Sequence, residues 1–141
     1  MSQENLQLHR RSVEAFNTRD VEAFIAFCDP QVELRSTVTV PGGAIYHGLD
    51  GVRRWHKDLE DAWGTELRVE PEAYFDLGEH TVTFHVLHGR GRQSGANVAM
   101  PAAHLCKWRD GLIVYFKGYA QRDEALRELG VSRAELEAIA P

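Results

Sequence analysis

Residues 97–121 contain two long apolar-rich runs separated by Arg109-Asp110-Gly111. Asp-Gly between such runs is a strong signal for a tight β-hairpin, so we expect one strand at about 96–109 and its partner at about 111–121. Both faces of these strands carry apolar side chains, so the sheet must be covered on both sides. We expect helices on one face and a second subunit on the other, with a ligand cavity and a dimer interface on opposite faces.

The composition predicts a single domain spanning residues 1–141. A chain of 141 residues that is 43% hydrophobic can build its own core. The formal charge of −5 disfavours a nucleic-acid partner, and no apolar run is long enough for a membrane span. The N-terminus, Met-Ser-Gln-Glu-Asn, is too polar for a signal peptide, and Cys28 and Cys106 fit no zinc spacing. These features predict a cytoplasmic protein with two reduced thiols.

Hydrophobic periodicity predicts an α+β chain. Apolar residues at helical spacing predict helices at about 3–17, from 21 to Asp29-Pro30, at 49–63 and at 123–129. Alternating patterns predict further strands at 31–40, 66–75 and 80–91. The order is helix, helix, strand, helix, then four antiparallel strands and terminal helices. Such a plan gathers the helices on one side of a curved sheet.

Two glycine-rich segments are predicted loops. Pro41-Gly42-Gly43 separates a strand from the third helix, and residues 89–95 lead into the hairpin. The second loop carries arginines, which invites a phosphate-binding interpretation. Phosphate-binding loops of that kind open onto a helix N-terminus, whereas this one opens onto a strand, so we do not favour that interpretation.

The chain resembles the SnoaL-like branch of the NTF2-like superfamily over roughly residues 5–130. The order and spacing of the matching stretches carry this resemblance. They are Glu14-Ala15-Phe16-Asn17 with Asp20, Asp29-Pro30 with Val32-Glu33, His47-Gly48 with Gly51-Val52, Asp76-Leu77-Gly78, Gly89-Arg90-Gly91 with Ser94-Gly95, Arg109-Asp110-Gly111 and Glu124-Ala125-Leu126. The resemblance implies an NTF2-like cone, in which a curved, mostly antiparallel sheet wraps around N-terminal helices and leaves a deep pocket.

Related enzymes include polyketide cyclases and ketosteroid isomerases, but their catalytic groups have no counterpart here. By alignment with the isomerase pattern, Leu34, Ser12 and Ala103 stand where that mechanism needs a carboxylate base, a tyrosine and a protonated aspartic acid. Gly118 and Gln121 stand where cyclase-like members often carry aspartates. The usual mechanisms of the family are therefore not expected, and the resemblance implies no cofactor.

Histidines are the remaining candidates for catalysis. The resemblance aligns His56 with a pocket tyrosine, and strand alternation puts His85 on the same face as Thr83. An imidazole can act as general acid or base, so His56 and His85 converging at the cavity mouth would form a catalytic pair. The alternative is that each is a half-buried structural histidine. His104 is a weaker candidate, because the expected register points it toward the dimer face.

The expected pocket is largely apolar. Its predicted lining residues are Ser12, Phe16, Leu34, Trp55, Leu59, Trp63, Thr83, Ala103, Leu105, Phe116, Gly118 and Ala120. Small residues opposite large aromatic ones suggest that space is left open. No metal site is expected, because His85 and His88 lie three apart on a strand and point to opposite faces.

The sequence therefore predicts a homodimer, paired through the open sheet face, that binds a small, mostly apolar molecule in a conical pocket. Whether it is an enzyme stays open at this point. As an enzyme it would be a cofactor-independent isomerase, cyclase or lyase acting by proton transfer. The alternatives are a non-catalytic binding module and a module whose only role is dimerisation.

Overall fold

The computed structural model describes residues 2–38, 43–91 and 95–141. Its elements are α1 (Ser2–Asn17), α2 (Val21–Ile25), β1 (Cys28–Ser36), β2 (Ala44–His47), α3 (Gly48–Trp63), β3 (Arg68–Leu77), β4 (His80–Arg90), β5 (Asn97–Arg109), β6 (Leu112–Tyr119), α4 (Arg122–Glu128) and a 3-10 turn (Arg133–Glu135). Parts of the predicted strand 31–40 and of the predicted loops 41–43 and 89–95 fall on residues 39–42 and 92–94, which lie outside the described residues.

The N-terminal helices form where the apolar spacing predicts them. α1 buries Val13 and Phe16, and α3 buries Trp55 on the face turned to the sheet. Asp20 caps α2, because its carboxylate accepts the Glu22 backbone N–H at 3.0 Å. Such a cap contributes about 1 kcal/mol to helix stability. Among the described residues, no helix is long and apolar enough to cross a membrane.

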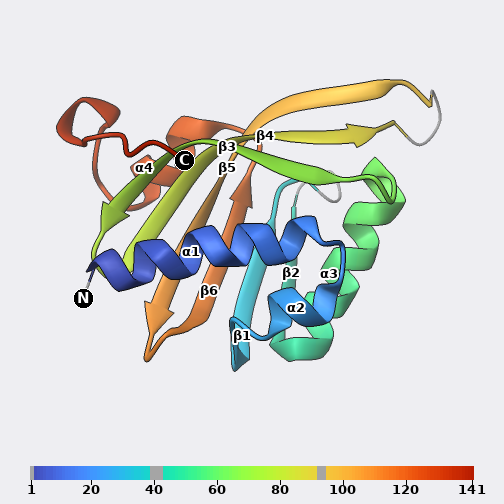
Figure 1. Ribbon diagram of the computed structural model, residues 1–141, viewed down its shortest axis with the longest axis horizontal. Coiled ribbons are helices and arrows are strands. Elements are labelled where there is room, and N and C mark those ends of the chain that lie inside the picture. Colours follow the sequence, from blue (N-terminus) through green and yellow to red (C-terminus); the bar gives the residue numbers. More distant parts are fainter. Residues whose placement is uncertain (1, 39–42, 92–94) are drawn as a thin grey trace.

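The sheet has six strands in the order β2-β1-β6-β5-β4-β3, and Figure 1 shows α1 lying across one of its faces. Neighbouring strands are antiparallel except for β1 and β6, which pair in parallel. The sequence analysis missed β2, which pairs with β1 and sets Tyr46 opposite Leu34. At four residues, Ala44–His47 is too short to display a period-two pattern. The predicted α+β class and the curved, mostly antiparallel sheet are confirmed.

The β5–β6 hairpin forms at the predicted turn but contains a β-bulge. Trp108 lies opposite Ile113, whereas the next residue back, Lys107, lies opposite Tyr115. Val114 is therefore an extra residue on β6. Side chains alternate between the two faces along a strand. One extra residue on β6 therefore changes which β5 side chains share a face with a given β6 side chain beyond the bulge.

This bulge decides which face of β5 looks toward α1. Beyond it, Cys106 lies opposite Phe116, and His104 lies opposite Gly118. Without the bulge, Leu105 would lie opposite Phe116 and would share its face. The prediction that the Leu105 face lines the cavity and that His104 points to the dimer face is therefore wrong. Leu105 packs into a separate apolar cluster on the back of the sheet.

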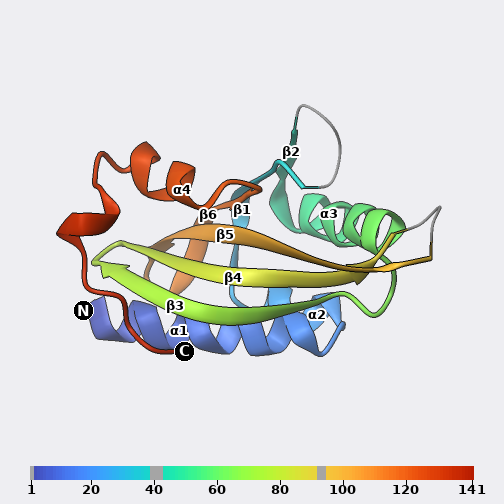
Figure 2. The same cartoon turned by 90° about the horizontal axis from the view of Figure 1, so that it is seen from above.

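The back of the sheet is partly covered by the C-terminal segment of the chain. Ala125 and Leu126 of α4 pack with Phe75 and Leu105 in that second cluster. Figure 2 shows α4 and α1 on opposite sides of the strands β3, β4 and β5. The expectation that all helices gather on one side is wrong in this respect. Part of the face assigned to a second subunit is occupied by the chain itself.

Gly89 is a position at which no side chain fits. A Cβ at this residue would lie 2.7 Å from the Trp63 carbonyl oxygen and 2.9 Å from the Trp63 Cβ. We predict that Gly89→Ala lowers the free energy of unfolding by about 1–3 kcal/mol, because β4 and the end of α3 must move apart. Urea-induced unfolding measures this change.

Gly118→Ala is the matched control for this substitution. Its Cβ would meet its nearest neighbours, His104 and Ser36, at 3.9 Å, an ordinary contact distance. The free energy of unfolding of this variant is expected to stay within about 0.5 kcal/mol of the parent. Equal losses in the two variants would contradict the assigned clash.

Candidate functional site

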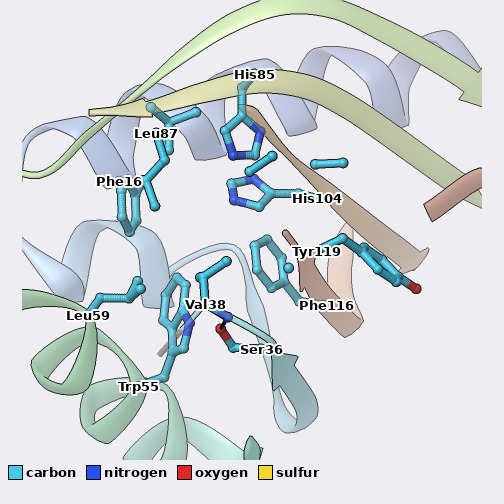
Figure 3. Close-up of a pocket in the computed structure, with 14 residues that line it drawn as sticks. Phe16, Ser36, Val38, Trp55, Leu59, His85, Leu87, His104, Phe116 and Tyr119 are labelled. Carbon is cyan, nitrogen blue, oxygen red and sulfur yellow. Dashed lines mark hydrogen bonds between the residues drawn. The ribbon is translucent and has the colours of Figure 1, made fainter. Parts of the chain in front are cut away.

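A narrow cavity lies between the sheet and the helices α1 and α3 (Figure 3). The cavity volume is about 20 Å³, which gives room for about one water molecule. The cavity is therefore narrower than the sequence predicts. Among the described residues, those that line the cavity carry no charge: they are Phe16, Ser36, Val38, Trp55, Leu59, Val69, His85, Leu87, Ala102, Ala103, His104, Phe116, Gly118 and Tyr119.

Two imidazoles form one wall of the cavity. His85 on β4 and His104 on β5 have ring centroids 4.1 Å apart with their planes inclined by 45°, and Figure 3 shows the His104 ring between those of His85 and Phe116. The Nδ1 atoms of both rings are buried and have no hydrogen-bond partner among the described residues. An unpaired buried polar atom costs about 1–3 kcal/mol. A ligand that supplies the missing hydrogen bonds would recover part of that cost.

Both imidazoles are neutral at pH 7. The pKa of His85 is lowered to about 3, mainly by burial and then by the positive charge of Arg122. Burial also holds the pKa of His104 well below 6.5, and the neighbouring His85 and His9 add to this effect. Each ring therefore offers one N–H donor and one bare nitrogen acceptor.

A second buried histidine site lies next to this pair. His9 on α1 has its Nδ1 2.7 Å from Thr81 Oγ1, and that oxygen accepts the Trp108 indole N–H at 2.8 Å. Because the indole only donates, the Thr81 hydroxyl can donate to His9 Nδ1, which leaves the proton of His9 on Nε2, 3.8 Å from Cys106 Sγ. Burial, and then His85, lower the pKa of His9 to about 3. This polar network holds α1 against β4 and β5.

His56 lies apart from the histidine pair. It is buried on α3, its Nδ1 lies 3.7 Å from Glu60 Oε1, and its ring packs edge-on against Phe16 with centroids 6.0 Å apart. It is not among the residues that line the cavity. The imidazole beside His85 is that of His104, which β5 presents to the cavity because of the bulge at Val114.

The predicted lining residues divide into two groups. Those that line the cavity are Phe16, Trp55, Leu59, Ala103, Phe116 and Gly118. Those that lie elsewhere are Ser12, Leu34, Trp63, Thr83, Leu105 and Ala120.

Local contacts explain several of the second group. The Ser12 hydroxyl donates to the His9 carbonyl at 2.7 Å, and the Trp63 indole N–H donates to the Val38 carbonyl at 2.9 Å. Leu34 is buried in the main core. Thr83 is buried on the cavity face of β4, where it lies opposite His104 and two residues before His85.

The sequence analysis missed Ser36, Val38, Val69, Leu87, Ala102 and Tyr119 as lining residues and placed His104 on the wrong face. A usable signal existed for two of them. Ser36 on β1 and Val38, two residues past its end, continue the alternation that begins at Leu34, which indicates the same side for all three. Ala102 and His104 carried no such signal, because their face depends on the bulge in β6.

The described part of the chain contains no group of three or more His, Cys, Asp or Glu residues that could hold a metal ion. His88 lies 2.7 Å from Glu70 Oε1 on the neighbouring strand, away from His85. Cys28 and Cys106 are free, buried thiols, and burial raises the pKa of Cys28 to about 12. These thiols are therefore protonated at neutral pH.

Comparison with known proteins identifies the family. The profile of the SnoaL-like domain matches residues 9–116. The chain belongs to the SnoaL-like domain family. No curated protein sequence matches this SnoaL-like domain.

Solved structures with the same NTF2-like fold include three bacterial proteins. An NTF2-like protein of unknown function from Burkholderia pseudomallei is 24% identical, with a TM-score of 0.74, 88% of this chain covered and 95% of that one. A hypothetical protein with a ketosteroid isomerase-like fold from Catenulispora acidiphila, in complex with trimethylamine, is 16% identical, with a TM-score of 0.71 and coverages of 88% and 92%. A protein from Xanthomonas campestris, provisionally assigned as a polyketide cyclase, is 20% identical, with a TM-score of 0.73 and coverages of 87% and 94%.

The buried histidines predict acid sensitivity of this SnoaL-like domain. Burial lowers the pKa of His9 and His85 to about 3, from 6.5 when exposed, so the unfolded chain binds more protons between these values. The free energy of unfolding should therefore fall as the pH drops below about 6.5, by up to about 1.4 kcal/mol per pH unit for each of these histidines. Urea unfolding at a series of pH values measures the slope.

A single substitution isolates one histidine in this titration. In the His85→Gln variant the side chain at position 85 cannot be protonated. The free energy of unfolding of this variant should therefore change less steeply with pH than that of the parent, by the contribution of one histidine. An unfolding free energy that is the same near pH 5 as near pH 7 would contradict the neutral burial of these imidazoles.

Proposed function

We propose that this SnoaL-like domain binds a small, mostly apolar molecule that carries one hydrogen-bonding group, such as a hydroxyl or a carbonyl. The observation that carries this proposal is the pair of buried, unpartnered Nδ1 atoms of His85 and His104 in a cavity with otherwise mostly apolar walls. Apolar pockets with a few convergent polar groups are typical of small-molecule sites. The aromatic rings of Trp55 and Phe116 would contact the apolar part of the ligand, and the Phe116 ring lies beside His104 with centroids 4.8 Å apart.

The narrow cavity requires side chains to move when the ligand enters. A cavity of about 20 Å³ is too small to hold a molecule with a six-membered ring. Leu59 and Leu87 line the cavity with side chains that can change rotamer. Gly118 and Ala102 line it with little or no side chain, so they take up little of its space. We infer that leucine rotamer changes create the required space, as is common at interfaces whose backbone moves little.

The charge state of the histidines favours binding over general base catalysis. A general base is most effective when its pKa lies near the working pH, but burial lowers the pKa of His85 to about 3. In the part of the chain that the structure describes, no carboxylate lines the cavity to take the proton instead. A proton-transfer isomerase, cyclase or lyase is thus the second candidate. It is favoured by the direct contact between the two imidazoles, one of which can donate while the other accepts.

We predict that phenol binds in the cavity more tightly than toluene, which has a similar size but no hydrogen-bonding group. Titration followed by NMR should shift the ring signals of His85 and His104. Gly118→Ala places a methyl group 3.9 Å from His104 and Ser36, inside the cavity, and should weaken phenol binding by about tenfold or more.

Ala99→Val is the matched control, because Ala99 is an exposed residue of β5 that does not line the cavity. Its affinity for phenol should equal that of the parent. If neither phenol nor toluene perturbs the histidine signals at millimolar concentration, the proposed binding function is rejected.

We further propose that two copies of the chain pair through the part of the sheet back that α4 leaves uncovered. This part belongs to β2 and β1, because Glu128 of α4 already contacts Lys117 and Tyr115 of β6. Ile45 on β2 supports the proposal. Among the described residues it is the one large hydrophobic residue that is exposed to solvent, with an exposed fraction of 54%. A second copy packed against this region would remove Ile45 from water.

Light scattering at micromolar concentration tests the pairing and is expected to give the mass of two chains. Ile45→Glu should shift the mass to that of one chain, since a carboxylate would be buried at the interface. Glu66→Gln, which changes an exposed residue beyond the other edge of the sheet, should leave the dimer intact. A monomeric parent protein would overturn the proposal.

A further inference from the structure

Arg122 contacts the strands of the cavity from the back of the sheet. Its Nη2 donates a hydrogen bond to the His85 carbonyl at 2.6 Å, and its Nε donates to the Ala102 carbonyl at 3.3 Å. His85 and Ala102 lie directly opposite each other on β4 and β5, and both line the cavity. One guanidinium group therefore joins the two strand positions that carry a wall of the cavity.

Further contacts hold the guanidinium in place. Its Nη2 also forms an ion pair with the Glu72 carboxylate, and its central carbon lies 5.6 Å from the centroid of the Phe84 ring. Glu72 is the extra residue of a bulge between Pro71 and Ala73 on β3. Three neighbouring strands thus supply the partners of Arg122, whose side chain is 25% exposed.

Helix stability does not explain an arginine at this position. Arg122 is the first residue of α4, the end at which the helix dipole favours acidic side chains. The next two residues, Asp123 and Glu124, follow that preference. A cation in the first turn opposes it, so the contacts with the strand carbonyls account for Arg122 better than its role in the helix does.

We propose that Arg122 is a positioning residue, which fixes from the back of the sheet the backbone from which His85 and His104 reach into the cavity. His104 follows Ala102 by two residues on β5 and presents its ring to the same side. A planar guanidinium can donate to two carbonyls at once, whereas a lysine ammonium on a flexible stem cannot hold both in a fixed geometry. The inference concerns the geometry of the free protein and does not depend on the identity of the ligand.

The charge of Arg122 has a second effect on the same imidazole. After burial, it is the next largest cause of the lowered pKa of His85. The other groups that face this ring are His104, which packs against it at a tilt, and His9, which interacts with both rings electrostatically. The Glu72 carboxylate pairs with Arg122 on the far side of the sheet.

The test compares Arg122→Gln and Arg122→Lys with the parent by native-state amide hydrogen exchange and by NOEs between the rings of His85 and His104. In both variants the amides of residues 84–86 and 102–104 should exchange at least about tenfold faster, beyond any loss of global stability measured by urea unfolding. The NOEs between the two rings should weaken. Arg122→Lys keeps the positive charge and guards against the case in which Arg122→Gln does not fold.

Arg127→Gln is the control, because Arg127 is an exposed arginine of the same helix. It should leave both the exchange of these amides and the NOEs between the rings unchanged. A merely structural role for Arg122 predicts faster exchange throughout the sheet, in proportion to global stability, with the ring contact preserved. That outcome, or unchanged local exchange in a folded Arg122→Lys protein, would overturn the inference.

Discussion

The arrangement of the cavity depends on one backbone irregularity, the extra residue Val114 in β6. Because side chains alternate along a strand, this residue reverses the matching of faces between β5 and β6. Beyond the bulge the face of β5 that carries His104 and Cys106 joins Phe116 and Gly118 under the helices. Leu105 is turned to the back of the sheet, where α4 covers it. The histidine pair, the buried network around His9 and the second apolar cluster all follow from this register.

Burial of several imidazoles on one face has a consequence for the chemistry of the site. His85 lowers the pKa of His9, and both of them lower the pKa of His104. Among the described residues, no carboxylate lines the cavity to stabilise a proton on these rings. The side chains are therefore kept as neutral hydrogen-bonding groups. His9 uses its Nδ1 in a hydrogen bond with Thr81, and this bond holds α1 against the sheet. His85 and His104 each keep a buried nitrogen without a partner, which is the feature of the site most suited to recognising a ligand.

Local patterns were sufficient for most of the fold. The helical spacing of Val13 and Phe16, the cap at Asp20 and the Asp-Gly turn each act within a few residues, so the sequence alone predicts the elements they govern. The family resemblance added the cone-like plan and was confirmed. The site was predicted less well. Phe16, Trp55 and Leu59 were found because a helix keeps its face regardless of its neighbours, whereas His104 was misplaced because a strand face depends on the pairing register.

The sequence by itself determined the order and type of the elements, the position of the hairpin and the apolar character of the chain on both sides of the sheet. Only the tertiary structure decided that His104 and not His56 stands beside His85, that α4 covers part of the sheet back, and that Arg122 reaches the carbonyls behind the cavity. The physical reason is that these features depend on residues far apart in the chain. A single unpaired residue in β6 changes the outcome without changing any local pattern in β5.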